Sequence, residues 1–349
     1  MRAVIVGTGL IAHNHAQALR QQGHELFGVV SRRVEGAKQF AGQYGCGVYS
    51  DALSAELLAG ADAVHVCTPP GEHYPYVKMA LKAGKAVFCE KPLTFDAAQA
   101  EELCCLAEEK GVLAAVNFNN RFYPACGEIR QRLYECGGVE LVHGHYRQEF
   151  QMMPAPWSWR YTDPYRAVTE IGSHFVDLMR YLSGKEVESL SAMFHTVQPG
   201  RVVREGMMVD GGAGESVTVT NEDAATVNFR FTGGGMGSVF LSEISPGRSN
   251  DLAIELVTME ESFAFHSEDP YAIRVGRKGC GIARESNAFG GGFSTTFSDA
   301  IAAFYASLEA GGLDDRLATL RDGLAAARIC EAMKRSAKMG GAFVKVDEF

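Results

Sequence analysis

Near the start of the chain, Val4-Ile5-Val6 runs directly into Gly7-Thr8-Gly9-Leu10-Ile11-Ala12. The three leading apolar residues predict a short strand, and the G-x-G-x-x-A run that follows predicts a tight turn into a helix. Small residues at these positions let a helix N-terminus approach a pyrophosphate closely. The stretch therefore predicts the first strand, turn and helix of a dinucleotide-binding α/β domain, with a merely tight strand–helix turn as the alternative.

The alternation of apolar strand and helix continues to about residue 121. Strands are predicted near residues 3–6, 25–31, 63–68, 86–89 and 113–118. The strands at 63–68 and 86–89 lack polar alternation, as strands that are covered on both faces do. Residues 1–121 therefore predict a Rossmann domain with a right-handed, doubly wound parallel sheet.

The pattern changes after Pro124. Residues 226–231 and 252–256 alternate, or nearly so, between apolar and polar, which fits antiparallel strands with one solvated or partner-covered face. Helices are predicted over 297–308, from apolar residues at i, i+4, i+7 and i+11, and from 317 to about 338. We expect a second α/β domain over 122–349, with an open, largely antiparallel sheet and final helices that can pack back on the first domain.

The composition limits the partners and the compartment. Lys and Arg number 33 and Asp and Glu number 42, so the net charge is −9, which argues against nucleic acid or an anionic membrane as the main partner. No apolar run approaches the ~20 residues that span a bilayer. The first strand is expected to begin at Ala3, which leaves no room for a signal peptide, so we expect a cytoplasmic protein. Nine cysteines without a C-x-x-C pair are expected to be reduced structural thiols.

The end of the second predicted strand bears on which dinucleotide binds. NAD-specific sites usually place an Asp or Glu there, to accept the ribose 2′-hydroxyl. This chain has Ser31-Arg32-Arg33 instead, a hydroxyl and two guanidiniums suited to the 2′-phosphate of NADP. We expect NADP(H) to be preferred over NAD(H). The alternative is two solvated arginines at a helix start.

Two further strand ends carry candidate functional residues. Glu90-Lys91-Pro92 follows the apolar run 86–89 and so places a lysine at the carboxyl end of a parallel strand, where open α/β sheets bind ligands. The sequence 67–73 ends the neighbouring strand, and its prolines let the chain turn past the nicotinamide ribose. His73 in that segment either contacts the cofactor or only caps the next helix.

A helix predicted over 169–184 carries a polar face beside an apolar stripe. Glu170, His174, Asp177 and Tyr181 lie at i, i+4, i+7 and i+11 on that polar face. A histidine with a purely structural hydrogen bond is one alternative to a catalytic His174. We expect no metal there, because a Glu-x-x-x-His pair has no evident third ligand. The aromatic, cationic segment 157–161 fits either stacking on sugar rings or filling the seam between the domains.

These motifs together resemble the glucose-fructose oxidoreductase, inositol dehydrogenase and rhizopine-catabolism (Gfo/Idh/MocA) family. The likeness spans nearly the whole chain and rests on the following segments: Gly7 to Ala12, Thr68-Pro69-Pro70 with His73, Gly84-Lys85 leading to Glu90-Lys91-Pro92, Glu170-Ile171-Gly172-Ser173-His174 with Asp177, and 318–324 continuing to Ser336-Ala337. It implies a Rossmann domain joined to an α/β domain whose open sheet often mediates dimers or tetramers, and oxidation or reduction of sugars and cyclitols.

The resemblance also implies a cis Lys91–Pro92 bond, against a general frequency of about 5 to 6% for X-Pro bonds. One position departs from the family pattern. The family usually has Asp four residues before the histidine, whereas this chain has Glu170. The departure puts the role of the third catalytic residue in doubt more than the other two.

The expected reaction is hydride transfer between the nicotinamide and a hydroxyl or keto carbon of a sugar, cyclitol or related polyol. We assign His174 as the base and Lys91 as the cation near the substrate oxygen, with Glu170 orienting the imidazole or binding a hydroxyl. The candidate cofactor contacts are Gly7, Thr8, Gly9, Leu10, Ile11, Ser31, Arg32, Thr68, Pro69, His73, Glu90, Lys91 and Asn117. The candidate substrate contacts, in an expected cleft between the domains, are Arg121, Arg160, Tyr161 and Asp177.

Two other functions stay open from the sequence. The fold also hosts NAD-dependent glycosidases, which oxidise a sugar transiently and eliminate the aglycone, and regulatory proteins that sense dinucleotides without chemistry. Lys91 and His174 argue against a pure sensor. We expect a homodimer or homotetramer that forms through the C-terminal sheet.

Overall fold

The computed structural model describes residues 1–152, 154–162, 166–209 and 211–346. It comprises two compact units, and each is described by itself below. The first unit consists of Met1–Tyr123 together with Gly291–Ala327, and the second of Pro124–Gly290 together with Arg328–Phe349. No helix within the described ranges is long and apolar enough to cross a membrane.

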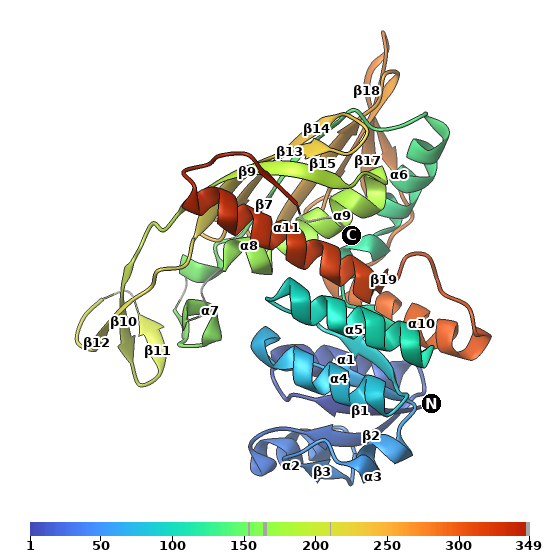
Figure 1. Ribbon diagram of the computed structural model, residues 1–349, viewed down its shortest axis with the longest axis vertical. Helices are drawn as coiled ribbons and strands as arrows, with labels where there is room; N and C mark the ends of the chain where they lie inside the picture. Colours follow the sequence, from blue (N-terminus) through green and yellow to red (C-terminus); the bar gives the residue numbers. More distant parts are fainter. Residues whose placement is uncertain (153, 163–165, 210, 347–349) are drawn as a thin grey trace. The chain divides into compact units, whose positions relative to one another are not determined.

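The first unit contains a seven-stranded sheet with the strand order β19-β6-β5-β4-β1-β2-β3. Strands β1, β2 and β3 of this sheet are labelled in Figure 1. The strands are β1 (Arg2–Val6), β2 (Glu25–Val30), β3 (Tyr49–Ser50), β4 (Ala63–Val66), β5 (Ala86–Cys89), β6 (Ala114–Val116) and β19 (Ala318–Thr319). All neighbours are parallel except β19, which pairs antiparallel with β6. This order, with the chain leaving β1 in both directions, is the doubly wound sheet that the sequence predicts.

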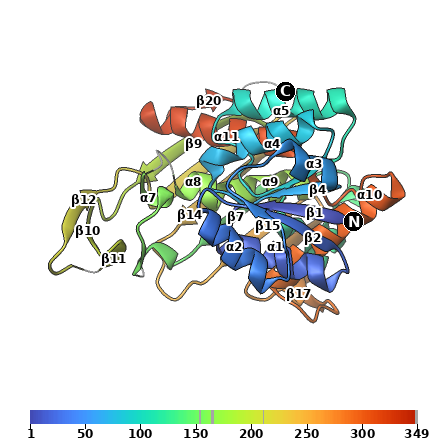
Figure 2. The same cartoon turned by 90° about the horizontal axis from the view of Figure 1, so that it is seen from below.

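Helices cover both faces of this sheet, as Figure 2 shows for α1 and α2 on one side and α3 and α4 on the other. The helices of this unit are α1 (Leu10–Gln21), α2 (Val34–Gln43), α3 (Ala55–Gly60), α4 (His73–Lys82), α5 (Ala97–Lys110) and α10 (Phe293–Ala310), with 3-10 turns η1 (Pro70–Glu72) and η2 (Asn119–Phe122). One apolar cluster joins Ile5 and Phe88 of the sheet to Leu19 of α1, Phe40 of α2 and Phe304 of α10. The other face carries the alternate strand residues, since successive side chains of a strand point to opposite faces.

The second unit is built on a nine-stranded sheet with the order β18-β17-β16-β15-β7-β14-β13-β9-β20. Its strands are β7 (Leu141–Arg147), β9 (Val187–His195), β13 (Ala224–Phe231), β14 (Met236–Ser242), β15 (Asp251–Val257), β16 (Glu261–His266), β17 (Ala272–Arg277), β18 (Gly281–Ser286) and β20 (Val344–Lys345). Every pair is antiparallel except β14 and β7. The sheet is therefore largely antiparallel, as expected. A small second sheet has the order β12 (Glu215–Thr218), β10 (Gly200–Arg204), β11 (Met207–Val209) and β8 (Ala155–Pro156).

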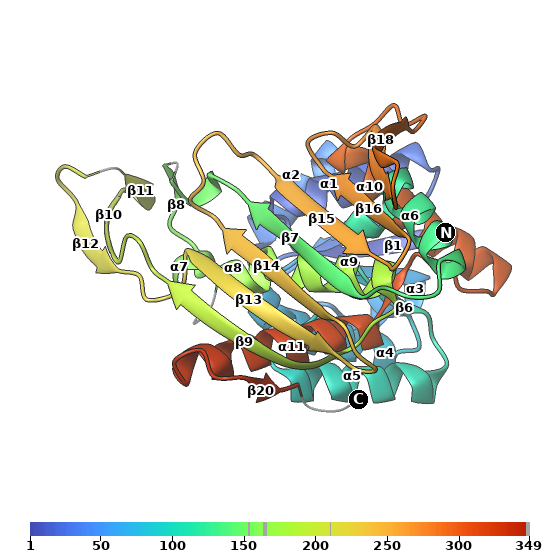
Figure 3. The same cartoon turned by 90° about the horizontal axis from the view of Figure 1, so that it is seen from above.

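One face of the large sheet is covered and the other is open. Alternate residues of β13 are buried, and the residues between them are exposed or half-buried. Figure 3 shows β7, β13, β14 and β15 in front of α8 (Ala167–Glu170) and α9 (Gly172–Ser183), and no helix of the described part of this unit lies over the front of these strands. The remaining helices are α6 (Pro124–Glu135), which packs on α9, α7 (Trp159–Thr162), the 3-10 turn η3 (Phe150–Met152) and α11 (Leu320–Lys338), which begins in the first unit and ends in the second.

Two predicted helix boundaries were wrong. The helix predicted to start at 317 starts at Leu320, because residues 318–319 form β19 against β6. The single helix predicted over 169–184 is interrupted at Ile171. There α8 packs on β13 and β14 whereas α9 packs on β7 and β15, so the two segments follow different strands. Gly172 permits the close approach, since a Cβ there would lie 2.9 Å from Cδ1 of Leu241.

Candidate active site

The turn after β1 has the backbone that a phosphate site needs. Gly7 has φ +105°, and a Cβ there would lie 2.6 Å from the carbonyl oxygen of Cys67, so no other residue fits without a backbone shift. Gly9 is the N-cap of α1, and a Cβ on it would meet nothing within 4 Å. Leu10 is 91% exposed, whereas Ala12, on the inner side of the same helix, is fully buried. The N-terminus of a 12-residue helix is thus left open, where its free N–H groups favour an anion.

The end of β2 is tied to this turn. The Thr8 hydroxyl donates to Oγ of Ser31 at 3.3 Å. Arg32 is exposed, and its guanidinium pairs with Glu72 at 2.7 Å. An exposed pair of this kind contributes little to stability, so the Arg32 guanidinium can exchange partners. Ile11, also assigned to the cofactor, is half-buried within α1.

Glu90, at the end of β5, belongs to a buried polar chain. Its Oε1 accepts hydrogen bonds from Asn117 Nδ2 at 2.8 Å and from His15 Nε2 at 3.1 Å. His15 Nδ1 lies 2.7 Å from His65 Nδ1, and His65 Nε2 lies 2.8 Å from the hydroxyl of Tyr305. One proton assignment satisfies every link with both histidines neutral: Tyr305 donates to His65, His65 to His15, and His15 to Glu90.

The pKa direction of His65 agrees with this assignment. Burial lowers the pKa of His65 well below its usual value, so its neutral form is favoured. Burial opposes ionisation of Glu90, but hydrogen bonds from His15 and Asn117 outweigh it and hold the carboxyl pKa below its usual value. Glu90 is therefore an ionised, fully anchored carboxylate beside Lys91. Burial also raises the pKa values of Cys67 and Cys89 well above normal, so their unreactive thiol forms are favoured. All nine cysteines are free thiols, as expected.

Lys91 lies at the carboxyl end of β5. Its backbone N–H donates to Oε2 of Glu90 at 3.3 Å, and the Lys91–Pro92 bond is cis, as predicted. His73 is fully buried, with Nδ1 2.8 Å from the Pro92 carbonyl oxygen and Nε2 2.8 Å from the Thr68 carbonyl oxygen. Its ring thus ties the segment after β4, which includes the half-buried Pro69, to the segment after β5.

Two candidate residues follow β6. Asn117 reaches Glu90 through its side chain, and its backbone N–H donates to the Cys89 carbonyl at 2.8 Å. Arg121 is buried, and its guanidinium lies 3.1 Å from Asp322, at the start of α11. Both residues therefore have partners within the first unit, and the ion pair of Arg121 with Asp322 links η2 to α11.

In the second unit, a buried charge cluster positions α8. The Glu222 carboxylate accepts the backbone N–H groups of Arg166 at 3.0 Å and Val168 at 2.9 Å, and so caps the N-terminus of α8. The fully buried Arg166 side chain pairs with Asp223 and, at 2.8 Å, with Glu243. Burial raises the pKa of Glu243 well above normal, and the negative charge of Glu170 raises it further. The positive charge of Arg166 lowers this pKa but does not cancel the rise. The hydrogen bonds to Glu222 and the ion pairs of Arg166 thus fix the backbone that precedes Glu170.

Glu170 and His174 are both largely buried, at 8% and 5% exposure. Glu170 Oε1 lies 2.7 Å from Nε of Arg160, a pairing between two residues that the sequence analysis assigned to different roles. The His174 ring centroid lies 6.2 Å from that of Tyr146 on β7. Asp177, on α9, is also buried.

The segment 157–161 is organised by its aromatic rings. Trp157 stacks on Tyr161 with centroids 5.3 Å apart and an interplanar angle of 8°. Tyr161 is buried in a small cluster with Met208 and Val219, which accounts for its ring without a ligand. Arg160 lies 4.6 Å from the Trp159 ring centroid, within the range of a cation–π contact.

Sequence reasoning missed two groups of residues around these candidates. One is the chain of His15, His65 and Tyr305 behind Glu90, and the other is the cluster of Arg166, Glu222, Asp223 and Glu243 behind Glu170. The available signals for the first group were His65 inside the apolar strand 63–66 and His15 on the helix 10–21. The polar triplet Asn221-Glu222-Asp223, with its two acidic residues just before a strand, was the signal for the second.

Comparison with known proteins gives consistent results over both units. Residues 1–118 match the family model described as the Gfo/Idh/MocA oxidoreductase family, NAD-binding Rossmann fold, and residues 132–264 match that of the GFO/IDH/MocA C-terminal domain. Inositol 2-dehydrogenase of Rhizobium meliloti (strain 1021) is 27% identical over 342 residues, 96% of each chain. Levoglucosan dehydrogenase of Pseudarthrobacter phenanthrenivorans is 30% identical over 216 residues, 59% of this chain and 55% of that protein, so this match spans about half of it.

The solved structures agree on the fold. A structure of levoglucosan dehydrogenase in complex with NADH and L-sorbose superimposes with a TM-score of 0.90 at 23% identity, and covers 99% of each chain. Since the family models together match more than half of the chain, and the relative from R. meliloti spans both units, the chain belongs to the Gfo/Idh/MocA family of NAD-binding oxidoreductases.

Proposed function

We propose that this protein is an NAD(P)-dependent dehydrogenase or reductase that acts on a CH–OH carbon of a sugar, cyclitol or related polyol. Family membership supports the class, and the names of relatives, which include inositol 2-dehydrogenase and D-glucoside 3-dehydrogenase, support the substrate type. Residues 1–121 are assigned to the dinucleotide, and residues 122–349 to the substrate and to contacts between subunits through the open sheet.

The observation that carries the proposal is the placing of Lys91 relative to the turn at Gly7. The order β5-β4-β1 puts their strands two steps apart in one parallel sheet, and both residues follow the carboxyl ends of their strands. Two steps of strand spacing amount to about 10 Å. A dinucleotide whose pyrophosphate binds the turn can therefore extend its nicotinamide along the same edge toward Lys91.

The nicotinamide, when bound, supplies the acceptor or donor of the hydride. Lys91 then places its ammonium near the substrate oxygen and stabilises the negative charge that develops there. His174 takes the proton of the hydroxyl during oxidation and returns it during reduction. Glu170, held by Arg160, orients His174 or accepts a hydrogen bond from a second substrate hydroxyl. Glu90, anchored from behind by His15 and Asn117, holds the backbone of Lys91 in place.

For the cofactor, we propose that NADP(H) binds more tightly than NAD(H). The reason is that Ser31 and Arg32, which follow the end of β2, are not acidic, and that the exposed Arg32 forms a surface pair with Glu72. A 2′-phosphate carries more charge than the Glu72 carboxylate and accepts a bidentate guanidinium contact, so it can replace Glu72 as the partner of Arg32.

The proposal is tested with a panel of sugars, cyclitols and their keto forms, read by nicotinamide absorbance with each dinucleotide. Net oxidation or reduction of at least one polyol or ketone is expected. Release of an aglycone without net change in nicotinamide would indicate the glycosidase chemistry instead. Tight dinucleotide binding with neither reaction would indicate a sensor and contradict the proposal.

A further inference from the structure

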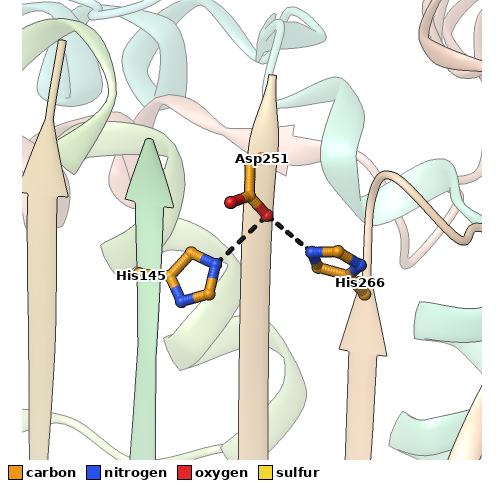
Figure 4. A group of neighbouring side chains, drawn as sticks. All are labelled: His145, Asp251 and His266. Atoms are coloured by element: carbon orange, nitrogen blue, oxygen red, sulfur yellow. Dashed lines mark hydrogen bonds and ion pairs between the residues drawn. The ribbon is translucent and has the colours of Figure 1, made fainter. Parts of the chain in front are cut away.

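Three side chains converge on the open face of the large sheet, opposite the face that α9 covers. His145 on β7 and His266 on β16 both lie opposite Ala253 of β15, one on each side. Asp251 lies two residues before Ala253 and so points to the same face. Because the Ala253 side chain is small, the two imidazoles can both lean toward Asp251, as Figure 4 shows.

The distances between the three donor atoms suit a metal ion. Nε2 of His145 lies 3.1 Å and Nε2 of His266 lies 2.5 Å from Oδ1 of Asp251, and the ligand atoms of all three lie within 4.8 Å of one another. Bonds of about 2.0 to 2.1 Å to a tetrahedral zinc ion place its ligands roughly 3.3 Å apart. Small rotations of the partly exposed imidazoles would therefore bring the three atoms around one ion.

Neighbouring side chains hold the Asp251 carboxylate so that its Oδ1 faces the two imidazoles. The side chain of Asp251 is fully buried, and its Oδ2 accepts a hydrogen bond from Nε of Arg147 at 2.8 Å. Arg248 lies 3.4 Å from the same oxygen and is itself paired with Glu268 at 2.7 Å. Partners that orient a ligating carboxylate in this way are typical of protein metal sites. The Arg147 charge opposes a cation and limits the expected affinity.

There is also room for an ion and a further ligand. A pocket of about 270 Å³ is lined by His145 and His266, and also by Ala253 and Asp269. Two imidazoles and one carboxylate form a ligand set that zinc and related divalent transition metals favour, and three protein ligands leave a fourth position for water or another group.

We propose that His145, Asp251 and His266 form a binding site for a divalent transition-metal ion of the zinc type, which ties together β7, β15 and β16. In the sequence, Glu170 and His174 are the pair with ligand spacing on one helix, and no metal is expected there. No local pattern reveals the site on the sheet, because Asp251 is 106 residues from His145 and 15 from His266. The proposal does not depend on the proposed dehydrogenase activity.

The test uses the full chain, freed of metal by a chelator and titrated with Zn²⁺ by calorimetry. One ion per chain is expected. The His266→Ala variant is expected to weaken binding at least about tenfold, since one of three ligands is lost. His143→Ala is the matched control: His143 lies on the same strand and the same face as His145, is exposed, and pairs with Glu255 at 3.0 Å, so its loss should leave the affinity unchanged.

A second measurement guards against a variant that misfolds. Co²⁺ in place of zinc is expected to give visible absorption bands in the parent and in His143→Ala, and much weaker bands in His145→Ala and His266→Ala. Circular dichroism and dinucleotide binding should match the parent in all three variants. Absence of stoichiometric binding in the parent, or equal loss in the control and the ligand variants, would show a hydrogen-bonded cluster without a metal and overturn the proposal.

Discussion

Replacing His65 by Phe removes the middle link of the chain that ends at Glu90. His65 is fully buried between His15 and Tyr305, and its ring also lies against Phe88 and Phe304, so a phenyl ring is compatible with the space. The substitution leaves Nδ1 of His15 and the Tyr305 hydroxyl without their partners. Each buried orphan costs about 1–3 kcal/mol, so the free energy of unfolding is expected to fall by about 2–6 kcal/mol.

A double-mutant cycle with Tyr305→Phe isolates the hydrogen bond. In the parent, Tyr305→Phe leaves Nε2 of His65 unsatisfied and is expected to cost about 1–3 kcal/mol. In the His65→Phe background the same change removes an orphaned hydroxyl, so it is expected to be neutral or stabilising. Urea unfolding of the four proteins measures the coupling. Equal costs of Tyr305→Phe in both backgrounds would refute the hydrogen-bonded chain.

The pH dependence of stability checks the protonation state. Burial lowers the pKa of His65 in the folded protein, whereas in the unfolded chain it is about 6.5. Below about pH 6.5 the unfolded chain therefore binds a proton that the folded protein does not, and stability falls as the pH falls, by up to about 1.4 kcal/mol per pH unit. His65→Phe is expected to flatten this loss between about pH 6.5 and 5. An unchanged slope would show that His65 is protonated in the folded protein.

Three further predictions concern the site itself. Ser31→Asp should reverse the preference for NADP(H), measured as dissociation constants for both dinucleotides, and equal constants in the parent would contradict the assignment of Ser31. Lys91→Met and His174→Ala should each lower kcat by roughly 10² or more with little change in cofactor affinity, and near-normal turnover in either variant would remove that residue from the mechanism. Glu170→Gln should slow turnover and move the acid limb of the kcat/KM profile to lower pH, because loss of a nearby negative charge disfavours the imidazolium. A profile that overlays the parent's would make Glu170 a bystander.

The parts of the fold that the sequence predicts well are those set by local patterns. β1, the turn at Gly7 and α1 follow from one apolar run and two glycines, and Lys91 falls at a strand end because an apolar run stops there. The interruption at Ile171 could not be predicted, since it depends on where α8 and α9 meet strands that come later in the chain.

The buried residues that support Glu90 and Glu170 could not be predicted either, because their contacts join distant parts of the chain. Tyr305 is 240 residues from His65, and Glu222 is 56 residues from the backbone N–H of Arg166 that it caps. Nothing in the local sequence links either pair. The pairing of Arg160 with Glu170 likewise joins two separate motifs, and it changes how the carboxylate is expected to act, because part of its charge is already balanced.

A deuterium label on the substrate carbon shows whether the protein transfers a hydride to the nicotinamide. The polyol that reacts best in the panel is prepared with deuterium on the carbon to be oxidised and incubated with the protein and the oxidised dinucleotide, and mass spectrometry follows both products. The proposal expects one deuterium in the reduced nicotinamide for each ketone formed, with His174→Ala slowing both products equally. Ketone formation without label in the nicotinamide, or bound dinucleotide that stays oxidised and unlabelled throughout, would contradict it.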